Sequence, residues 1–431
     1  MLYENLSVNE KGHLTFAGLD AVELAARYGT PAYFLDENRV RENCRKYTHA
    51  FRAHFPAGSR PHFASKALCF KALYPILQEE DFGADVVSGG EMMTALAAGF
   101  PAEHICFHGN NKTIEEIRFA VEKGVGLIAV DNPTELQRVS EISGAAGKVQ
   151  RVLLRLTPGI DPHTFAAVNT GKIDCQFGMA IETGQAKRFV AEALRTPNLE
   201  IVGYHCHIGS QIFDQNPFID AARIMMDFAA DIRDEYGYAP EVLNLGGGFG
   251  VRYVESDPHV DIPACIGLIA KELRILCAER SMPLPAVHME PGRSIVADAC
   301  ITLYTAGPVK TIEGYRSYAV IDGGMSDNPR YALYGSAYTV LVANKALCAP
   351  ESPITIAGRC CESGALIQEN VALPRVETGD IIAVLTTGAY NYSMASNYNR
   401  ICRPPVVLIK DGECRLGVRR ETWEDMTACD L

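Results

Sequence analysis

Between residues 32 and 290, short hydrophobic runs alternate with amphipathic stretches. Several runs are almost continuously apolar, such as LIAV at 127–130 and RVLLRL at 151–156. Continuous apolar strands separated by helices are typical of a parallel sheet covered on its outer face. The number of such units favours an α/β fold of the TIM-type (β/α)8 barrel class. The candidate strands are 32–35, 62–65, 84–87, 105–108, 127–130, 151–156, 201–207, 242–245 and 287–290.

The helical stretches between these strands have end signals. Thr113 and Glu116 stand three residues apart before an apolar run, which predicts a capping box, and Gly124 predicts the end of that helix. A longer helix is predicted to follow an N-cap at Asn216 and to end at Gly237. Both segments fit the helices that a barrel needs between its strands.

After about residue 294 the pattern changes to short strands and turns, with a hairpin turn predicted at Asp411-Gly412. We therefore expect a TIM-type barrel over residues 32–293. We expect a second, β-rich domain of the sandwich or barrel type over residues 294–431, joined by residues 1–31, whose polar and apolar positions also alternate.

Composition narrows the possible partners. A chain of 431 residues with 48% hydrophobic content can bury a large core. Its 40 basic and 52 acidic residues give a net charge of -12, which disfavours non-specific binding to nucleic acid or to an anionic membrane. The first residues lack the pattern of a secretory leader, and no segment approaches the roughly 20 apolar residues of a membrane span. We expect a cytoplasmic protein with a small-molecule partner.

The cysteines do not predict a metal site. All 14 are scattered along the chain, mostly in apolar runs, and no CxxC pair occurs. Buried free thiols are the default in a long chain without an export signal, and a structural zinc site needs paired ligands. No metal is expected.

Two glycine-rich segments follow predicted strands. IGSQ at 208–211 follows the seventh candidate strand, and GGGFG at 246–250 follows the eighth. In such barrels the site lies at the carboxyl ends of the strands, and phosphate is often held by the last two loops. A triple glycine alone is more often a tight turn. Two such loops side by side predict a phosphate cradle made of backbone N–H groups and the Ser210 hydroxyl.

Other reactive side chains are predicted at the same end of the barrel. Lys66 ends a strand in PHFASKALC, and His205 and His207 lie two apart on another strand, so they share a face. A metal role for the two histidines is less favoured than packing or stacking on a planar cofactor, because no third ligand is suitably spaced. Glu290 and Arg293, in EPGR, form either a salt bridge at a turn or a part of the site.

These parts together match the needs of pyridoxal phosphate. That cofactor needs a lysine for its aldehyde, an acid for its pyridine nitrogen, a stacking ring and a phosphate cradle. A single lysine at a strand end is usually a solvated side chain. The combination favours catalysis by Lys66.

The chain resembles the fold type III, alanine-racemase-like decarboxylases along nearly its whole length. FASKAL is similar to the Schiff-base motif of that family. The other similar blocks are DVVSGGE (85–91), FHGNNK (107–112), PGIDPHT (158–164), HIGSQ (207–211), NLGGGFG (244–250), EPGR (290–293), CESG (361–364) and GAYNYSMASNYNR (388–400).

The resemblance implies roles for individual residues. Lys66, Glu290 and Cys361 are implied to be catalytic. The implied pyridoxal phosphate site comprises Lys66, Asp85, His207, Ser210, Gly247, Gly248, Glu290, Gly292, Arg293 and Tyr390. The implied substrate site comprises Arg293, Arg330, Tyr334, Glu362 and Tyr390, in which an arginine fork grips a carboxylate and Glu362 meets the distal ammonium.

The resemblance also implies a mechanism and an assembly. The substrate amine displaces Lys66 from the cofactor, carbon dioxide leaves, and Cys361 of the partner subunit or Lys66 protonates the remaining carbon. The second domain completes the site, and the CESG segment comes from the partner in a two-fold homodimer.

Three blocks depart from the family pattern. Ala365 stands where an aspartate is common, Cys175 and Gln176 replace a usual serine and lysine, and Phe165 replaces a common histidine.

Three interpretations of the function remain open. The leading one is decarboxylation of meso-2,6-diaminopimelate to L-lysine, the last step of lysine synthesis. The second is decarboxylation of another basic amino acid of the ornithine, arginine or D-lysine type, and the third is a catalytically silent homologue.

Overall fold

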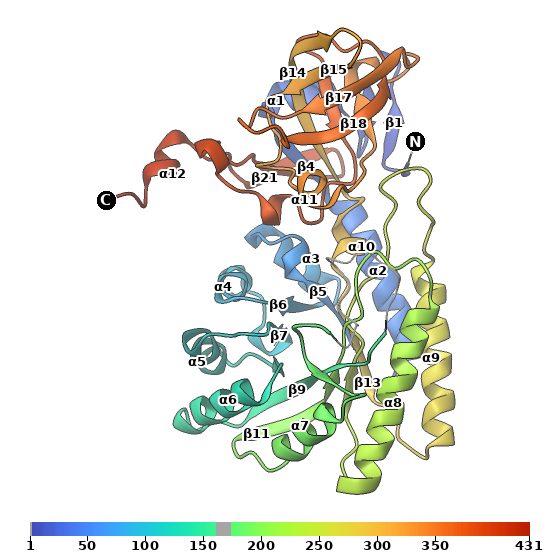
Figure 1. Cartoon of the computed structure of the whole chain (residues 1–431), viewed down its shortest axis with the longest axis vertical. Coiled ribbons are helices and arrows are strands. Elements are labelled where there is room, and N and C mark those ends of the chain that lie inside the picture. The colour runs from blue at the N-terminus through green and yellow to red at the C-terminus, as the bar shows by residue number, and fades with distance from the viewer. Residues whose placement is uncertain (1, 161–173) are drawn as a thin grey trace. The chain divides into compact units, whose positions relative to one another are not determined.

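The computed structural model describes residues 2–160 and 174–431 (Figure 1). Two compact units account for the chain. The barrel unit comprises residues 43–250 and 259–292, and the β unit comprises residues 1–42, 251–258 and 293–431. Phe165, part of the PGIDPHT block and the residues just before Asp174 lie outside the described residues.

In the described residues of the barrel unit, eight parallel strands form a closed ring, because β13 pairs with β5 and β8 pairs with β9. The TIM-type barrel is confirmed. A further short strand, β10 (Met179–Ala180), pairs with β9. The ring strands are β5 (Arg60–Ala64), β6 (Gly83–Val86), β7 (Ile105–Phe107), β8 (Leu127–Val130), β9 (Gln150–Thr157), β11 (Leu199–His205), β12 (Val242–Asn244) and β13 (Ala286–Met289).

The prediction that residues 32–35 form a barrel strand was wrong. Strand β4 (Ala32–Asp36) pairs with β14 (Cys300–Ile312) and β20 (Val406–Lys410) in the β unit. All five of its residues are buried, so the apolar pattern of this strand suits the barrel sheet as well as the sheet of the β unit. The barrel therefore begins at β5. Lys66 follows the first strand rather than the second, HIGSQ follows the sixth, the glycine loop the seventh and EPGR the eighth.

Helices cover the outside of the barrel (Figure 1). The capping box of Thr113 and Glu116 and the left-handed Gly124 are confirmed at the ends of α5. Helix α8 differs by one residue at its start, because Gln215 is the N-cap and Asn216 is the first helical residue. The helices are α2 (Glu37–His54), α3 (Tyr74–Glu79), α4 (Gly89–Ala97), α5 (Ile114–Lys123), α6 (Pro133–Ala145), α7 (Gln185–Ala193), α8 (Asn216–Tyr236) and α9 (Ile262–Glu279), with short 3-10 turns η1 (Ser65–Ala67), η2 (Lys71–Leu73) and η3 (Ala102–His104).

The β unit is built mainly from antiparallel strands. The predicted hairpin turn is confirmed between β20 and β21, where Asp411 and Gly412 both have positive φ. The remaining strands are β1 (Leu6–Val8), β2 (Leu14–Phe16), β3 (Leu19–Asp20), β15 (Arg316–Ile321), β16 (Val340–Val342), β17 (Ser352–Ala357), β18 (Leu366–Leu373), β19 (Ile381–Val384) and β21 (Glu413–Val418). Its helices are α1 (Ala21–Tyr28), α10 (Arg293–Val296), α11 (Arg330–Tyr334) and α12 (Trp423–Thr427), with 3-10 turns η5 (Ala343–Lys345), η6 (Tyr392–Met394) and η7 (Tyr398–Arg400).

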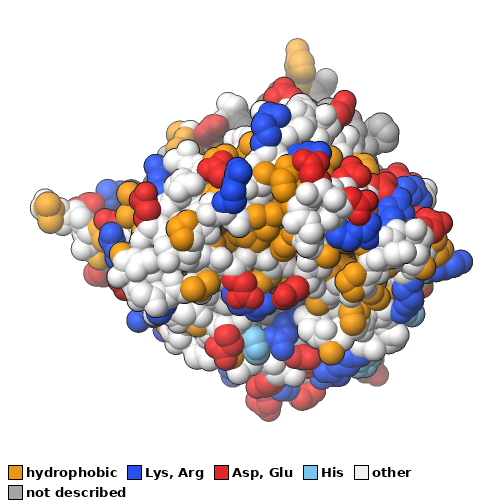
Figure 2. Space-filling model, turned by 90° about the horizontal axis from the view of Figure 1, so that it is seen from below, with side chains coloured by type: hydrophobic (Ala, Val, Ile, Leu, Met, Phe, Trp, Pro, Cys, Tyr) orange, Lys and Arg blue, Asp and Glu red, His pale blue; other side chains and the backbone are white. Residues whose placement is uncertain are grey.

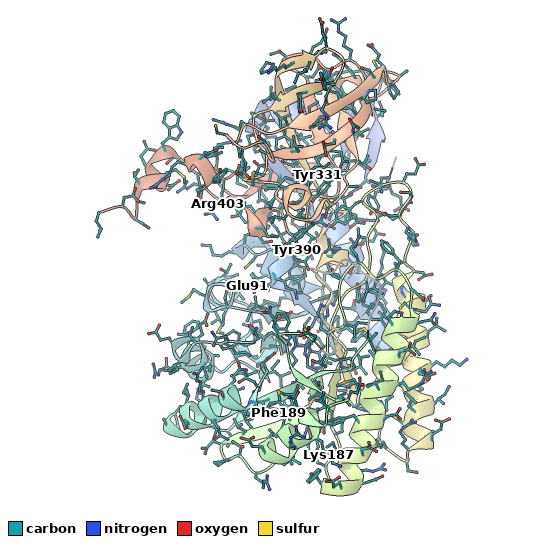
Figure 3. All side chains as sticks on the ribbon, in the orientation of Figure 1. Glu91, Lys187, Phe189, Tyr331, Tyr390 and Arg403 are labelled. Atoms are coloured by element: carbon teal, nitrogen blue, oxygen red, sulfur yellow. The ribbon has the colours of Figure 1, made fainter. Side chains whose placement is uncertain are left out.

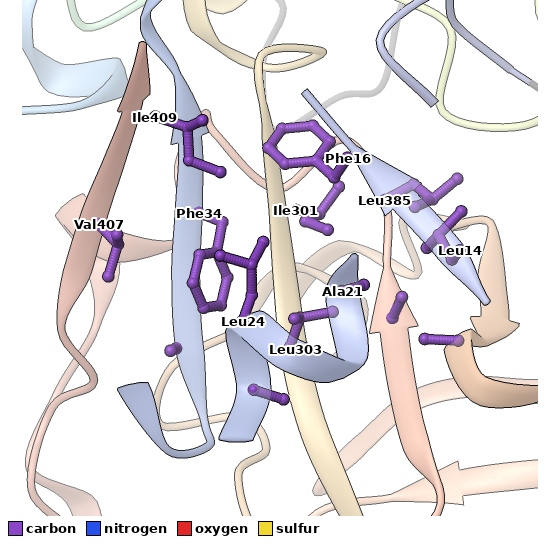
Figure 4. Packing of buried hydrophobic residues seen from close by; sticks show 14 of the residues in the cluster. Leu14, Phe16, Ala21, Leu24, Phe34, Ile301, Leu303, Leu385, Val407 and Ile409 are labelled. Atoms are coloured by element: carbon purple, nitrogen blue, oxygen red, sulfur yellow. The ribbon is translucent and has the colours of Figure 1, made fainter. Parts of the chain in front are cut away.

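One apolar core joins the N-terminal residues to the rest of the β unit (Figure 4). Phe16 from β2, Phe34 from β4 and Leu303 from β14 are fully buried in the same cluster, with Val407 from β20. Burying side chains of this size stabilises a fold by about 1.5–3 kcal/mol each. This packing explains why the opening residues belong to the β unit.

On the face drawn in Figure 2, acidic and basic side chains are interspersed and neither sign forms a large continuous block. In the described parts of the chain, none of the helices combines the length and the hydropathy of a membrane span.

Candidate active site

Lys66 lies directly beyond the first barrel strand. Strand β5 ends at Ala64, and the chain turns through η1, leaving the Lys66 side chain exposed between buried Ser65 and Ala67. The EPGR turn packs against this turn, since Ala64 N–H donates to the Pro291 carbonyl at 3.1 Å and a Cβ on Gly292 would come within 3.0 Å of Ala64 and Ala67. Only glycine allows the two turns to approach so closely. Lys66 and Glu290 therefore follow neighbouring strands.

Glu290 is the centre of a buried hydrogen-bonded group. His108 Nε2 lies 2.7 Å from Glu290 Oε1, and His205 Nε2 lies 3.1 Å from Oε2. Asn244 donates its side-chain N–H to Oε1 at 2.6 Å and accepts the Gly246 N–H at 2.9 Å. Glu290 thus receives its contacts from three other strands of the barrel.

The three acid–base groups in this cluster differ in protonation. Burial alone would raise the pKa of Glu290, but His108 and His205 lower it well below its usual range. Burial works against protonation of His108, yet Cys106, Glu290 and Asp85 raise its pKa well above the usual value. Burial lowers the pKa of His205 to about 4. At neutral pH the group therefore contains a carboxylate, an imidazolium and a neutral imidazole.

Cys106 belongs to the same cluster. Its Sγ lies 3.1 Å from His108 Nε2, and one ligand-type atom from each of Cys106, His108 and Glu290 lies within 4.8 Å of the others. Hydrogen bonding and the Glu290–His108 ion pair account for these contacts, so we assign no metal to them.

Asp85 on β6 is the second buried carboxyl group of the barrel. Burial raises its pKa to about 6, while the charges of His108 and Lys66 lower it in part. Its Oδ1 atom is buried and has no hydrogen-bond partner in the described residues. Because an unpaired buried acceptor is costly, Asp85 fits a position that a bound group completes.

His207 and the glycine loop lie together. The Gly247 N–H points at His207 Nδ1, 3.3 Å away, so that nitrogen accepts and carries no proton. Burial, followed by the charge of Lys66, lowers the pKa of His207 well below its usual value. His205 and His207, predicted to share a face, have separate partners: His205 binds Glu290 and His207 binds the loop.

The two loops predicted to hold phosphate are joined. The Ile212 N–H donates to the Gly248 carbonyl at 2.9 Å, next to Ser210. A Cβ on Gly247 would lie 2.1 Å from the Glu290 carbonyl oxygen, and one on Gly248, at φ +121°, would lie 2.4 Å from the Gly209 carbonyl oxygen. The loop therefore has to be glycine, and it presents backbone rather than side chains, as a phosphate cradle needs.

Arg293 in the β unit lies between two tyrosines. Its guanidinium donates to the Tyr253 hydroxyl at 2.8 Å and lies 4.7 Å from the centre of the ring of Tyr390, a residue labelled in Figure 3. Tyr390 has φ +61°, which is rare for a residue with a side chain and is strained. The structure thus brings together Arg293 and Tyr390, two of the predicted site residues.

Arg330 is a buried guanidinium in the same unit, only 5% exposed. It donates to the Tyr338 hydroxyl at 2.9 Å and to Ser336 Oγ at 3.2 Å. Within the described residues no carboxylate forms an ion pair with it. A buried charge normally has an opposite charge beside it, so this guanidinium is suited to bind an anionic ligand.

Tyr334, predicted to join Arg330, lies at the end of α11 with 40% of its surface exposed. Tyr338, four residues later, makes the hydroxyl contact with Arg330 and accepts from Asn391 at 3.1 Å.

The CESG segment is an exposed turn between β17 and β18. The Cys361 N–H donates to Asn399 Oδ1 at 2.8 Å, and Glu362 bonds the Tyr398 hydroxyl, which raises the pKa of Tyr398. Ala365, one of the departures from the family pattern, is 2% exposed and closes the turn through its N–H to the Glu362 carbonyl. Gln176 is exposed, and its carbonyl accepts from Asn110 at 3.4 Å.

Sequence reasoning missed several residues of these clusters. His108 and Asn244 lie in the FHGNNK and NLGGGFG blocks, at the ends of barrel strands. Site residues of such barrels lie at the carboxyl ends of the strands, so this rule would have found them as it found Lys66. Tyr253 and Tyr338 lie in segments without a motif, and nothing in the sequence singled them out.

Comparison with known proteins identifies the family of this chain. Residues 37–297 match the family model described as "Pyridoxal-dependent decarboxylase, pyridoxal binding domain". Diaminopimelate decarboxylase of Bacillus subtilis (strain 168) is 44% identical over 425 residues, covering 98% of this chain and 96% of that protein. The enzyme of the same name from Bacillus methanolicus is also 44% identical, over 421 residues covering 98% and 97%. The chain belongs to the pyridoxal-dependent decarboxylases.

A solved structure leads to the same family. Diaminopimelate decarboxylase from M. jannaschii in co-complex with L-lysine superposes with a TM-score of 0.91 at 33% identity, covering 99% of this chain and 98% of that one. Pyridoxal phosphate is the cofactor of this decarboxylase, and the barrel residues fit it: an amine at Lys66, an ionised carboxylate at Glu290, an orphaned buried acceptor at Asp85 and a loop restricted to glycine.

Proposed function

We propose that this decarboxylase converts meso-2,6-diaminopimelate into L-lysine and carbon dioxide, the last step of lysine synthesis. One observation supports the chemistry above the others: Glu290 is buried yet held ionised, and it follows the strand next to the one that precedes Lys66. The names and the near-complete coverage of the relatives support the choice of substrate.

The barrel residues hold the cofactor in this proposal. When bound, pyridoxal phosphate accepts the electron pair that a departing carboxylate leaves on the substrate carbon. Lys66 would offer the amine for the cofactor aldehyde, Glu290 would accept a hydrogen bond from the pyridine nitrogen, and the neutral His207 ring would lie against the cofactor. The proposal also assigns cofactor contacts to Asp85, Ser210, Gly247, Gly248 and Gly292 of the barrel unit and to Arg293 and Tyr390 of the β unit.

The substrate is held by residues of the β unit. Arg330 binds a substrate carboxylate through its fork of N–H groups, since its own surroundings offer hydroxyls and aromatic rings but no carboxylate in the described residues. Arg293, Tyr334 and Tyr390 complete the carboxylate contacts, and Glu362 binds the distal ammonium. A substrate with an amino acid group at each end uses both kinds of contact.

Loss of carbon dioxide breaks one carbon–carbon bond, and the remaining carbon then takes up one proton. The donor in this proposal is Cys361 or Lys66. Cys361 is exposed on its own subunit, which allows it to serve a neighbouring one.

A homodimer that shares its sites follows as part of the proposal. If Cys361 is the donor, Lys66→Ala and Cys361→Ala subunits should each be inactive alone, whereas in a shared site a mixed dimer keeps one intact pair. After random exchange of subunits, activity recovers to about a quarter of the wild-type value. No recovery, with exchange verified by mass spectrometry, would show that each subunit uses its own Cys361.

We also propose a cytoplasmic location. All 14 cysteines are free thiols in the structure, which suits a reducing compartment. Cell fractionation tests this, and recovery of the protein with oxidised cysteines in an exported fraction would contradict it.

The substrate test is carbon dioxide release from meso-, LL- and DD-diaminopimelate and from both enantiomers of ornithine, lysine and arginine. We expect release from the meso isomer alone, with L-lysine as product and Lys66→Ala as blank. Release from a diamine with a single carboxylate would replace the proposed substrate and point to Ala365, and silence across the panel with cofactor bound would indicate a catalytically silent homologue.

A further inference from the structure

Glu290 has more hydrogen-bond partners than a carboxylate needs in order to bind a pyridine nitrogen. His108, after β7, and Asn244, at the end of β12, both bind Oε1, at 2.7 Å and 2.6 Å. His205, at the end of β11, binds Oε2 at 3.1 Å. Four different strands thus determine the position of one carboxylate.

We propose that His108 is a positioning residue that gives Glu290 a permanent positive partner, while His205 and Asn244 fix the direction of its remaining acceptor site. The inference rests on the proposed function, because it assigns that remaining site to the cofactor's pyridine N–H.

The number of acceptor sites on the carboxylate supports this assignment. An ionised carboxylate offers about four lone-pair sites to donors. His108, His205 and Asn244 fill three of them in the described structure. One site remains, which matches a single donor. A side chain held by three neighbours cannot turn to another partner, so its direction is preset before the cofactor binds.

The charges follow from the same contacts. Glu290 is only 8% exposed, and a lone carboxylate there would take up a proton. His108 is protonated because acidic groups surround it, and the two charges cancel. His205 is neutral, so its Nε2–H donates to Glu290 while its buried Nδ1 has no partner in the described residues. His108 and His205 therefore have different roles despite similar distances.

Other titratable groups also surround Glu290 and have to be considered in any pH experiment. Burial and the neighbouring charges keep His62 and His288 neutral at neutral pH, and Asp85 titrates near pH 6. Among the described residues, the titratable groups that interact electrostatically with Glu290 include His62, Asp85, Cys106, His108, His205, Cys206, His207 and His288.

The test uses the cofactor's absorbance in the absence of substrate. Wild type, His108→Asn, His108→Gln and His205→Asn are loaded with pyridoxal phosphate, and the absorbance is titrated with pH alongside the cofactor Kd. His62→Asn is the matched control, because His62 is an equally buried barrel histidine without a bond to Glu290. Both His108 variants should shift the apparent pKa of the absorbance change by about 1–3 pH units, since an adjacent opposite charge shifts a pKa by about that much. His205→Asn should weaken cofactor binding with a smaller shift.

Steady-state kinetics separate positioning from a structural role. The His108 variants should lower kcat by about tenfold or more with little change in KM, because Glu290 acts on the reacting electrons rather than on substrate binding. In a Glu290→Gln background, His108→Asn should have almost no further effect on the titration, since the charge it balances is gone.

Each result has a clear meaning. Folded His108 variants with a wild-type titration would overturn the inference while leaving the proposed function intact. The same shift in His62→Asn would also overturn it, because the effect would then be one of general packing. A wild-type protein that forms no cofactor band would overturn both the inference and the proposed function.

Discussion

The guanidinium of Arg330 lies 4.5 Å from the centre of the Tyr253 ring, although the two residues belong to distant segments of the chain. Tyr253 also bonds Arg293, so one aromatic ring connects two buried cations. Tyrosine faces stabilise guanidinium groups without neutralising them. Both cations therefore keep their charge for an incoming anion.

Replacing Arg330 by lysine should impair substrate binding. A lysine ammonium cannot reproduce the paired N–H groups, and the loss of a hydrogen bond to a buried charge is worth about 2–5 kcal/mol. We expect kcat/KM to fall by about 30-fold or more, mainly through KM, while the cofactor absorbance stays unchanged. The control is Arg415→Lys, an exposed arginine paired with Glu37, which should stay close to wild type. Equal KM values for Arg330→Lys and wild type would remove Arg330 from the substrate site.

Gly247→Ala should damage the cofactor loop. Its Cβ would come 2.1 Å from the Glu290 carbonyl oxygen, so the loop has to move away from the eighth strand. Overpacking of this kind costs about 1–3 kcal/mol. We expect a raised Kd for pyridoxal phosphate and a lower midpoint of denaturation.

The matched control is Gly267→Ala, in the middle of helix α9. Its Cβ would meet only the end of the His54 side chain, at 3.4 Å. Alanine in a helix interior is favoured over glycine by about 0.5–1 kcal/mol. This variant should be as stable as wild type or more so and bind the cofactor normally, and similar losses in both variants would contradict the steric argument.

His288 should make stability depend on pH. Burial lowers its pKa in the folded protein to about 4, against about 6.5 in an unfolded chain. Between these values the unfolded chain binds a proton that the folded protein does not, so His288 reduces stability as the pH falls from 6.5 to 4. The loss is about 2–3 kcal/mol at pH 4.5.

His288→Asn tests this by comparison with wild type. Asparagine lacks the titration, so the difference in unfolding free energy between variant and wild type should narrow by about 2–3 kcal/mol between pH 7.5 and pH 4.5. Urea denaturation at both pH values measures it. The exposed His259→Asn serves as control and should change stability by no more than about 0.5 kcal/mol. If the difference in unfolding free energy between His288→Asn and wild type did not change with pH, His288 would be protonated as readily in the folded protein as in the unfolded chain.

Phe34→Ala should destabilise the β unit. Phe34 is fully buried on β4 with Phe16 and Leu303, and truncating such a residue costs about 3–5 kcal/mol. Thermal denaturation of the whole chain should show an earlier transition. Tyr315→Ala, at a site 90% exposed in the same unit, should change stability by no more than about 0.5 kcal/mol. A Phe34 variant as stable as wild type would mean that the cavity collapses or fills.

Many features could be read from the sequence because they depend on local signals. The continuous apolar strands predicted the barrel, and the capping box at Thr113 predicted where α5 begins. Because Lys66 directly follows a strand, the sequence predicted that its side chain lies at the carboxyl end of the barrel. The count of strands was wrong by one, because residues 32–35 have an apolar pattern that suits either sheet, and pattern alone does not say which partner a strand selects.

The sequence by itself determined the barrel, the glycine loop and the side chains that pyridoxal chemistry needs, since periodicity and short motifs depend on neighbours along the chain. Only the tertiary structure decided that His108, His205 and Asn244 converge on Glu290, and that Tyr253 and Tyr338 enclose Arg330. These contacts join strands and loops far apart in sequence. The protonation of buried groups depends on distances and desolvation, which arise only once the strands close into a ring.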